Sequence, residues 1–300
     1  MGIAPRRESS TVNRGSEPIL APTIHDSQFR KLSSPERSPA IALTIAGSDC
    51  SAGAGLQADL KTFGAFGVFG LTAATCVVAE VPGKVSRIDG VDSRNVGQQI
   101  ELLLAHFPVA AIKTGLLYSA EIVETVAAIL ERSAKDIPLV VDPVMIATSG
   151  DALLQPAAVE CYRASLFPRA TLVTPNIPEA AALTGKPVRN LEEMRIAGEE
   201  LAQRFGTRFL IKGGHLAGES ATDLLFGGSA VAEFSAPFVD GVSTHGTGCS
   251  YSAAIAAGLA LGNDLESAIL RAKEFVSRAI REHFSWEASS GKIHALNLQR

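Results

Sequence analysis

A chain of 300 residues, 46% of them hydrophobic, can bury a large core, and we expect one large α/β domain. The formal net charge of -4 excludes a broad basic surface for nucleic acid, so an anionic ligand must be held by local groups. The four cysteines are scattered without a C-x-x-C pair, which argues against a disulfide framework or a zinc knuckle and favours a reducing cytoplasm.

The N-terminal residues differ in composition from the rest of the chain. Polar residues and prolines follow one another there with little hydrophobic periodicity, which predicts a disordered extension over residues 1–39. The segment lacks the apolar core of a secretory signal, and its acidic residues argue against a transit peptide. The chain also has no uncharged apolar run of about 18 residues. We therefore expect a cytoplasmic protein with no membrane partner.

From residue 40 onward, short apolar runs alternate with amphipathic segments, which predicts strands that alternate with helices. The expected strands are Ile41–Ala46, Leu71–Ala79, Val109–Ile112, Leu139–Val141, Thr171–Val173 and Phe209–Ile211. The expected helices include Val96–Phe107, Ile122–Leu130 and Leu191–Phe205, the last preceded by a capping box of Asn190 and Glu193. Right-handed crossovers between such units predict a mostly parallel central sheet with helices on both faces over residues 40–300.

Polar residues and glycines gather where the predicted strands end. The segments concerned are 47–55, Lys113–Gly115, Asp142–Met145, Thr174–Glu179 and Lys212–His215. Each is also ordinary turn chemistry, but ligands of open parallel sheets bind beyond the carboxyl ends of the strands, so together they predict a ligand site. Neither a G-x-x-x-x-G-K-[ST] nor a G-x-G-x-x-G motif occurs, which argues against a P-loop or dinucleotide enzyme.

The segment Thr244–Ser250, followed by a run of small residues, predicts a helix whose first turn binds an anion. Gly246 and Gly248 let the backbone approach a ligand closely, and the N–H groups that open a helix carry partial positive charge. Cys249 lies where these amides converge, so we expect its thiol to have a depressed pKa and to serve as a base. The alternative is a tight turn before a close-packed helix with an inert cysteine.

These segments, in this order, resemble the bacterial hydroxymethylpyrimidine and phosphomethylpyrimidine kinases of the ribokinase-like superfamily. The matching motifs are Ala46–Asp49, Gly53–Phe63, Asp142–Met145, Thr174–Ala180, Lys212–His215 and Thr244–Cys249. The resemblance implies a ribokinase-like three-layer sandwich and ATP-dependent phosphorylation of hydroxymethylpyrimidine, and then of its monophosphate, in thiamine biosynthesis. It also implies Mg²⁺ and a homodimer. With Arg300 as the last residue, we expect no fused thiamine phosphate synthase domain.

Phosphoryl transfer needs aligned oxygens and screening of charge more than covalent help. We interpret Gly246, Thr247 and Gly248 as an anion hole for the γ-phosphate. Lys212 is expected to add a cation and, with Asn176 and Thr247, to bind the nucleotide. The alternatives are a solvated surface lysine at 212 and a helix-capping role for Asn176.

The resemblance also implies roles for two carboxylates and a cysteine. Asp142 and Glu179 are expected to organise Mg²⁺ through water. Cys249 stands where much of the superfamily has an aspartate base, so it is expected to accept the proton of an alcohol acceptor. A phosphate acceptor is largely ionised at neutral pH and needs no base.

Pyrimidine recognition is where the chain departs from its relatives. By resemblance, Gly47, Asp59 and the end of the second strand line the ring pocket. Glu80 stands where glutamine is usual, and Leu116 where methionine is common. An ionised glutamate only accepts hydrogen bonds, so Glu80 favours a protonated ring, holds a proton itself, or faces elsewhere. We therefore expect the monophosphate to be the preferred acceptor and unphosphorylated hydroxymethylpyrimidine a poor one.

Two other functions remain open at this point. One is a pyridoxal kinase of the same superfamily, because some relatives that have the cysteine accept pyridoxal. The other is a nucleotide- or pyrimidine-binding regulator that has lost turnover. The presence of Lys212, Asp142, Glu179 and Cys249 argues against the regulator.

Overall fold

The protein is described by a computed structural model that covers residues 1–2, 38–145, 154, 156–214, 216, 220–242, 245–288 and 291–299. The chain divides into two compact units, Met1–Ser38 and Pro39–Arg300. The predicted disorder of the N-terminal extension falls on residues 3–37, which lie outside the described part of the chain. The helices and strands below all belong to the second unit.

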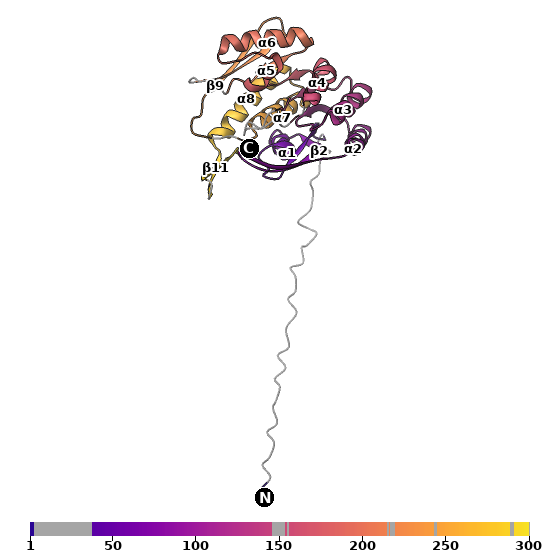
Figure 1. The fold of residues 1–300 in the computed structure, drawn as a ribbon, viewed down its shortest axis with the longest axis vertical. Helices are drawn as coiled ribbons and strands as arrows, with labels where there is room; N and C mark the ends of the chain where they lie inside the picture. The colour runs from indigo at the N-terminus through magenta and orange to yellow at the C-terminus, as the bar shows by residue number, and fades with distance from the viewer. Residues whose placement is uncertain are drawn as a thin grey trace. The chain divides into compact units, whose positions relative to one another are not determined.

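The middle layer of the second unit is a large sheet (Figure 1). Its described strands are β1 (Ile41–Asp49), β2 (Phe69–Val81), β3 (Lys84–Gly90), β4 (Val109–Thr114), β5 (Leu139–Val141), β6 (Leu172–Val173), β7 (Phe209–Ile211), β8 (Ser220–Phe226) and β9 (Ala232–Pro237). Their order in space is β3-β2-β1-β4-β5-β6-β7-β8-β9. The strands from β2 to β7 in this order are parallel, whereas β3, β8 and β9 are antiparallel at the two edges.

Helices cover both faces of the sheet (Figure 1). One face carries α1 (Gly55–Ala65), α7 (Thr247–Ala260) and α8 (Leu265–Arg281). The other carries α2 (Ser93–His106), α3 (Ala120–Ser133), α4 (Pro156–Cys161), α5 (Ile177–Thr184) and α6 (Leu191–Phe205). A π-helical turn, Tyr162–Leu166, and a 3-10 turn, Phe167–Arg169, continue α4, and β10 (Phe284–Ala288) pairs with β11 (Gly291–Ala295) in a separate hairpin. The predicted three-layer α/β sandwich is confirmed.

Each face of the sheet has its own hydrophobic core, because successive side chains of a strand point to opposite faces. In β5, Leu139 and Val141 belong to the core under α2 to α6, whereas Val140 belongs to the core under α7 and α8. Leu43 and Ala42 divide in the same way in β1. Strands that are buried on both faces are continuous apolar runs, which explains why the sequence pattern located them.

The predicted elements agree closely with the structure, and β5, β7 and α6 have the predicted bounds. The capping box predicted for α6 is half formed. Asn190 accepts the backbone N–H of Glu193, but the Glu193 carboxylate accepts the N–H of Arg189 instead of that of Asn190. The antiparallel edge strands and the hairpin were not predicted.

The fold gathers the carboxyl ends of the parallel strands at one edge of the sheet, where the chain leaves β1, β4, β5, β6 and β7 through the predicted polar segments. In the described part of the chain, no helix is both long and apolar enough to span a bilayer.

Candidate active site

Helix α7 begins at this edge with a glycine in the left-handed conformation. Gly246, the N-cap, has a φ of 81°, and a Cβ there would overlap the carbonyl oxygen of Gly53. Only glycine adopts this φ without strain and also leaves room for the Gly53 carbonyl oxygen. The start of an α-helix offers N–H donors and partial positive charge, so the turn from Gly246 to Cys249 has the backbone form of the predicted anion site. Thr244, the first residue of the motif, lies outside the described residues.

Lys212 and Asp142 reach this turn from the ends of β7 and β5. The Lys212 Nζ lies 3.0 Å from Asp142 Oδ1, and both side chains are nearly buried. A Cβ on Gly248 would lie 3.1 Å from Lys212 Nζ and 3.8 Å from Asp142 Oδ2. The missing side chain at Gly248 therefore leaves the ammonium group open toward the start of the helix.

The surroundings of Lys212 favour its protonated, positively charged form. Burial acts to lower the pKa of Lys212, but the carboxylates of Asp142 and Glu179 outweigh it, so that the pKa is raised. Only 8% of the residue is exposed, which excludes the alternative of a solvated surface lysine.

Ser252 is a member of this group that the sequence analysis missed. Its hydroxyl donates to Asp142 Oδ2 at 3.2 Å, and Thr174 donates to Oδ1 of the same carboxylate at 3.4 Å. Ser252 follows Gly248 by four residues and so lies on the same face of α7. That spacing is the signal that could have identified it.

Asn176 and Glu179 form a complete capping box at the start of α5. The Asn176 side chain accepts the Glu179 N–H at 2.9 Å, and Glu179 Oε2 accepts the Asn176 N–H at 2.8 Å. The backbone of Asn176 pairs with that of Lys212, so both residues lie at the site edge. Burial raises the pKa of Glu179 to about 7, with Lys212 opposing the rise and Asp142 adding to it. The predicted capping role of Asn176 is therefore confirmed. It is compatible with a role in nucleotide binding, and it leaves Glu179 beside the charged pair.

Cys249 lies in the first turn of α7, partly buried. Burial raises the pKa of its thiol to about 11, against the effect of Lys113 and with that of Asp142. The predicted depressed pKa is wrong for this structure, because burial, together with Asp142 and Asp59, outweighs the lowering effects of Lys113 and of the Gly55 backbone.

Asp59 lies beneath the site rather than on its surface. Its Oδ2 is 2.9 Å from Lys113 Nζ, with neither side chain exposed, and it also accepts the Thr44 hydroxyl at 2.6 Å. The other oxygen, Oδ1, is buried and has no hydrogen-bond partner among the described residues. Lys113 was seen in the sequence only as a polar strand end, and its partner on α1 could not be inferred.

Gly47 and Leu116 come together at the ends of β1 and β4. A Cβ on Gly47 would lie 2.7 Å from Cys76 Sγ and 3.5 Å from Leu116 Cδ2. Leu116 is partly buried against the core under α2 to α6. The ends of three neighbouring strands are thus closely packed at the predicted ring pocket.

Glu80 lies near the end of β2 with its side chain 15% exposed. Its carboxylate Oε2 is 3.9 Å from His245 Nε2. Cys50 is hydrogen-bonded to the backbone of Glu80. Its thiol donates to the Glu80 carbonyl at 3.2 Å and accepts the Glu80 N–H at 3.4 Å. The side chain therefore faces the segment that precedes α7.

Asp49 is a second residue to which the sequence analysis gave no role. Its Oδ2 accepts the N–H of Ala54 at 2.8 Å and that of Gly53 at 3.1 Å, and lies 3.1 Å from His245 Nε2. The carboxylate therefore ties the glycine-rich segment to the start of α7. Asp49 lies between a predicted buried strand and a glycine-rich segment, and this position could have identified it as a site residue.

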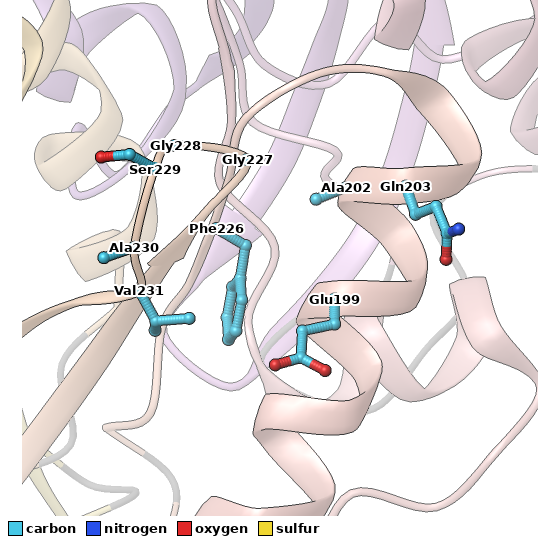
Figure 2. A pocket seen from close by; sticks show the side chains of 9 residues that line it. All are labelled: Glu199, Ala202, Gln203, Phe226, Gly227, Gly228, Ser229, Ala230 and Val231. Carbon is cyan, nitrogen blue, oxygen red and sulfur yellow. The ribbon is translucent and has the colours of Figure 1, made fainter.

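A surface pocket lies elsewhere, between α6 and the turn that joins β8 to β9 (Figure 2). It is lined by Glu199, Ala202, Gln203 and Phe226 to Val231. Phe226 is opposite Phe209, the first residue of β7, so this pocket is at the amino-terminal edge of the sheet. None of the predicted site residues lines it.

Comparison with known proteins shows the family to which the chain belongs. Residues 49–294 match the family model described as phosphomethylpyrimidine kinase. The chain belongs to the phosphomethylpyrimidine kinase family. The predicted resemblance is confirmed, and with it the assignment of this family member as a phosphotransferase.

Two curated relatives show how far the family likeness extends. The hydroxymethylpyrimidine/phosphomethylpyrimidine kinase of Streptomyces coelicolor is 44% identical over 260 residues, which cover 86% of this chain and 95% of that protein. The thiamine biosynthesis bifunctional protein of Geobacter sulfurreducens is 44% identical over 239 residues, which cover 80% of this chain. The match spans 49%, about half, of that bifunctional protein.

Solved structures support the ribokinase-like fold of this phosphomethylpyrimidine kinase family member. Bacillus subtilis pyridoxal kinase, in an ADP complex, matches with a TM-score of 0.79 and 34% identity over 87% of this chain and 98% of that one. Phosphomethylpyrimidine kinase from Clostridium difficile matches with a TM-score of 0.70 and 39% identity over 80% of this chain and 99% of that one.

Proposed function

We propose that the chain transfers the γ-phosphoryl group of ATP to 4-amino-5-hydroxymethyl-2-methylpyrimidine phosphate, which gives the diphosphate for thiamine biosynthesis. The observation that carries this proposal is the meeting of Lys212 and Asp142 with the start of α7 at Gly248. An ammonium group and a helix N-terminus with no side chain between them can screen the charge of a moving phosphoryl group.

In this proposal the backbone from Gly246 to Gly248, including Thr247, binds the γ-phosphate, and Lys212 neutralises part of its charge. A phosphate oxygen of the acceptor attacks the γ-phosphorus, the bond from phosphorus to the β–γ bridging oxygen breaks, and ADP leaves. Asn176, whose backbone pairs with Lys212, takes part in binding the nucleotide. These residues align the reacting oxygens, which is the main requirement of the reaction.

Asp142 and Glu179 fit a Mg²⁺ ion that is held through water. Both offer carboxylate oxygens, the donors that Mg²⁺ prefers. The two oxygens of Asp142 already accept from Lys212 and Ser252, and an ion held through water would leave those hydrogen bonds in place. The pKa of Glu179, raised to about 7, implies that a further positive charge here favours its ionised form. When bound, the ion would neutralise charge on the phosphates.

The state of Cys249 supports a phosphate acceptor over an alcohol. With a pKa near 11, its thiol is protonated and uncharged at neutral pH. A neutral thiol does not repel an acceptor phosphate, which is largely ionised and needs no base. An alcohol acceptor would have to be deprotonated by a group that holds its own proton tightly. Unphosphorylated hydroxymethylpyrimidine should therefore be the poorer acceptor.

Gly47, Asp59, Glu80 and Leu116 form the proposed acceptor side of the site. The first and last are packed together, and Glu80 faces the start of α7. Asp59 Oδ1, which is buried and has no hydrogen-bond partner in the described part of the chain, is an acceptor that a substrate N–H could satisfy.

The test is a paired assay of ADP release, with ATP and Mg²⁺ saturating and each pyrimidine varied in turn. We expect kcat/KM to be at least about tenfold higher for the monophosphate, ~1.4 kcal/mol in transition-state binding. Comparable values would contradict the acceptor preference. Absence of pyrimidine-dependent ADP release would contradict the function and support a non-catalytic regulator.

Cys249→Ala separates the two acceptors further. We expect a loss of about a thousandfold, ~4 kcal/mol, with the alcohol acceptor and a much smaller loss with the monophosphate. Equal losses in both reactions would show that Cys249 acts in some other way than as a base.

Pyridoxal phosphorylation is the second candidate, favoured by the fold match to a pyridoxal kinase over nearly the whole of that protein. The same assay with pyridoxal as acceptor tests it. A kcat/KM for pyridoxal above that of both pyrimidines would make this the principal activity.

A further inference from the structure

Three titratable side chains meet where the loop after β1, the end of β2 and the start of α7 come together. His245 Nε2 lies 3.1 Å from Asp49 Oδ2 and 3.9 Å from Glu80 Oε2. The Asp49 side chain is 1% exposed, that of His245 11% and that of Glu80 15%. Asp49 and His245 have no role in the proposed transfer, so the cluster needs its own explanation.

The spacing of these atoms would admit a metal ion, since all lie within 4.8 Å of one another. The hydrogen bonds favour a proton instead. Asp49 Oδ2 already accepts from the Ser51 hydroxyl and from the N–H groups of Gly53 and Ala54, so a cation would have to compete with these hydrogen bonds. His245 Nε2 faces two carboxylates and must carry a hydrogen to bond either of them.

The protons of the cluster can be assigned from these contacts. Burial alone would raise the pKa of Asp49, but hydrogen bonds from His245, Ser51 and the Ala54 amide hold it well below its usual range. Burial acts to lower the pKa of His245, but Asp49 and Glu80 raise it overall. Burial and Asp49 raise the pKa of Glu80, and His245 opposes the rise. The contacts therefore favour the imidazolium form of His245 between the two carboxylates, and the cluster in which all three groups are ionised carries a net charge of −1.

Other charged or titratable groups lie on the same elements. Two of them are paired away from the cluster, since Arg87 binds Asp89 and Lys61 donates to the Ala52 carbonyl. Among the described residues, the set on the packed elements is Cys50, Asp59, Lys61, Cys76, Lys84, Arg87, Asp89, Asp240, Cys249 and Tyr251. Asp59 is likewise paired, with Lys113.

An aminopyrimidine presents two adjacent groups on one edge, an exocyclic N–H donor and a ring-nitrogen acceptor. A carboxylate only accepts, so Glu80 can bond both groups only if one proton lies between it and the ring nitrogen. A glutamine amide would need no added proton. Because a bound ring displaces water, a neutral cluster is favoured over one that carries a net charge. Uptake of one proton from solvent would supply the hydrogen between Glu80 and the ring nitrogen, and it would also make the cluster neutral.

We propose that binding of the aminopyrimidine takes up one proton at Glu80, with His245 as a positioning residue whose positive charge holds Glu80 ionised until the ring arrives. This inference rests on the proposed aminopyrimidine acceptor. Its consequence is that acceptor affinity falls as pH rises, because the unbound protein must gain a proton that becomes scarcer. In a Glu80→Gln variant the same edge is bonded without a proton, so the dependence disappears.

The experiment measures binding of unphosphorylated hydroxymethylpyrimidine to the full chain by calorimetry, because this probe has no phosphate to titrate. Titrations at about pH 7.5 in two buffers of different ionisation enthalpy should give an uptake near one proton for wild type and near none for Glu80→Gln. Between about pH 7 and 9, Kd should rise tenfold per pH unit, ~1.4 kcal/mol, in wild type only. His245→Gln, which keeps a donor toward Asp49 but no charge, should move the onset of this rise to higher pH.

Three results would overturn the inference. They are equal proton uptake by wild type and Glu80→Gln, absence of binding by wild type, or no change of onset in His245→Gln. Binding of Zn²⁺ alone to wild type, lost in His245→Gln, would assign the cluster to a cation instead. Proton-linked binding without ADP release would refute the proposed kinase function and leave this inference standing.

Discussion

Gly248→Ala should lower kcat strongly without lowering the stability of the fold. Gly248 lies in the first turn of α7 without a left-handed backbone, so alanine fits the helix. The added Cβ, however, would stand 3.1 Å from Lys212 Nζ and 3.8 Å from Asp142 Oδ2. It would fill the space that the proposal assigns to a phosphate oxygen. Activity should therefore fall while stability does not. A general loss of folding would lower both.

The magnitudes follow from each effect in turn. Replacing glycine by alanine within a helix stabilises by about 0.5–1 kcal/mol, reduced here by whatever shift the Lys212 side chain must make. Loss of one donor to a developing anion costs about 100- to 1,000-fold in rate, ~3–4 kcal/mol. We expect a fall in kcat of that size with no loss in the free energy of unfolding.

Urea denaturation and the ADP-release assay measure the two quantities on the same preparation. Gly64→Ala is the matched control, because Gly64 lies in α1 with no atom within 4 Å of an added Cβ. It should stabilise without altering kcat. A Gly248→Ala variant that keeps kcat within about threefold, ~0.7 kcal/mol, would refute the assignment of the anion site.

Three further changes test the surroundings of the site. Glu179 has a pKa raised from 4.5 to about 7, so wild-type stability should fall as pH rises through that window, by about 3 kcal/mol at this group. In Glu179→Gln, urea denaturation at a series of pH values should show that fall removed, and an unchanged slope would contradict the raised pKa. Gly246→Ala places a Cβ against the Gly53 carbonyl at a φ of 81° and should destabilise by several kcal/mol, about 2 or more, in thermal unfolding. With Cys249 titrating near pH 11, the rate with the alcohol acceptor should climb about tenfold per pH unit above neutrality, and Cys249→Ala should flatten that profile.

Much of the sandwich could be predicted because its inner strands are buried on both faces. Leu139–Val141 and Phe209–Ile211 are short apolar runs bounded by polar residues, and each coincides with a strand. The edge strand Lys84–Gly90 has no buried residue and no apolar face, so nothing in its pattern distinguished it from a loop. Burial, the source of the signal, is what this edge strand lacks.

The site was predictable as far as it depends on strand ends and helix starts. Lys212, Asp142 and Gly248 meet because the topology brings their elements to one edge. The charge state of Cys249 was not predictable, because desolvation depends on packing from several elements. The pairing of Lys113 with Asp59 likewise joins residues that are 54 positions apart in the sequence, which no local pattern encodes.

The contact between His245 and Asp49 joins residues 196 positions apart, and Gly246 lies against Gly53 beside it. Both the anion turn and the ring pocket therefore need the first strand and a helix near the end of the unit at the same time. A chain still being synthesised, with α7 not yet released, would have neither, and its sheet would expose Val140, Leu172 and Leu210 to solvent. Such long-range closure is slow compared with local structure formation. During refolding, enzymatic activity should return later than helical circular dichroism.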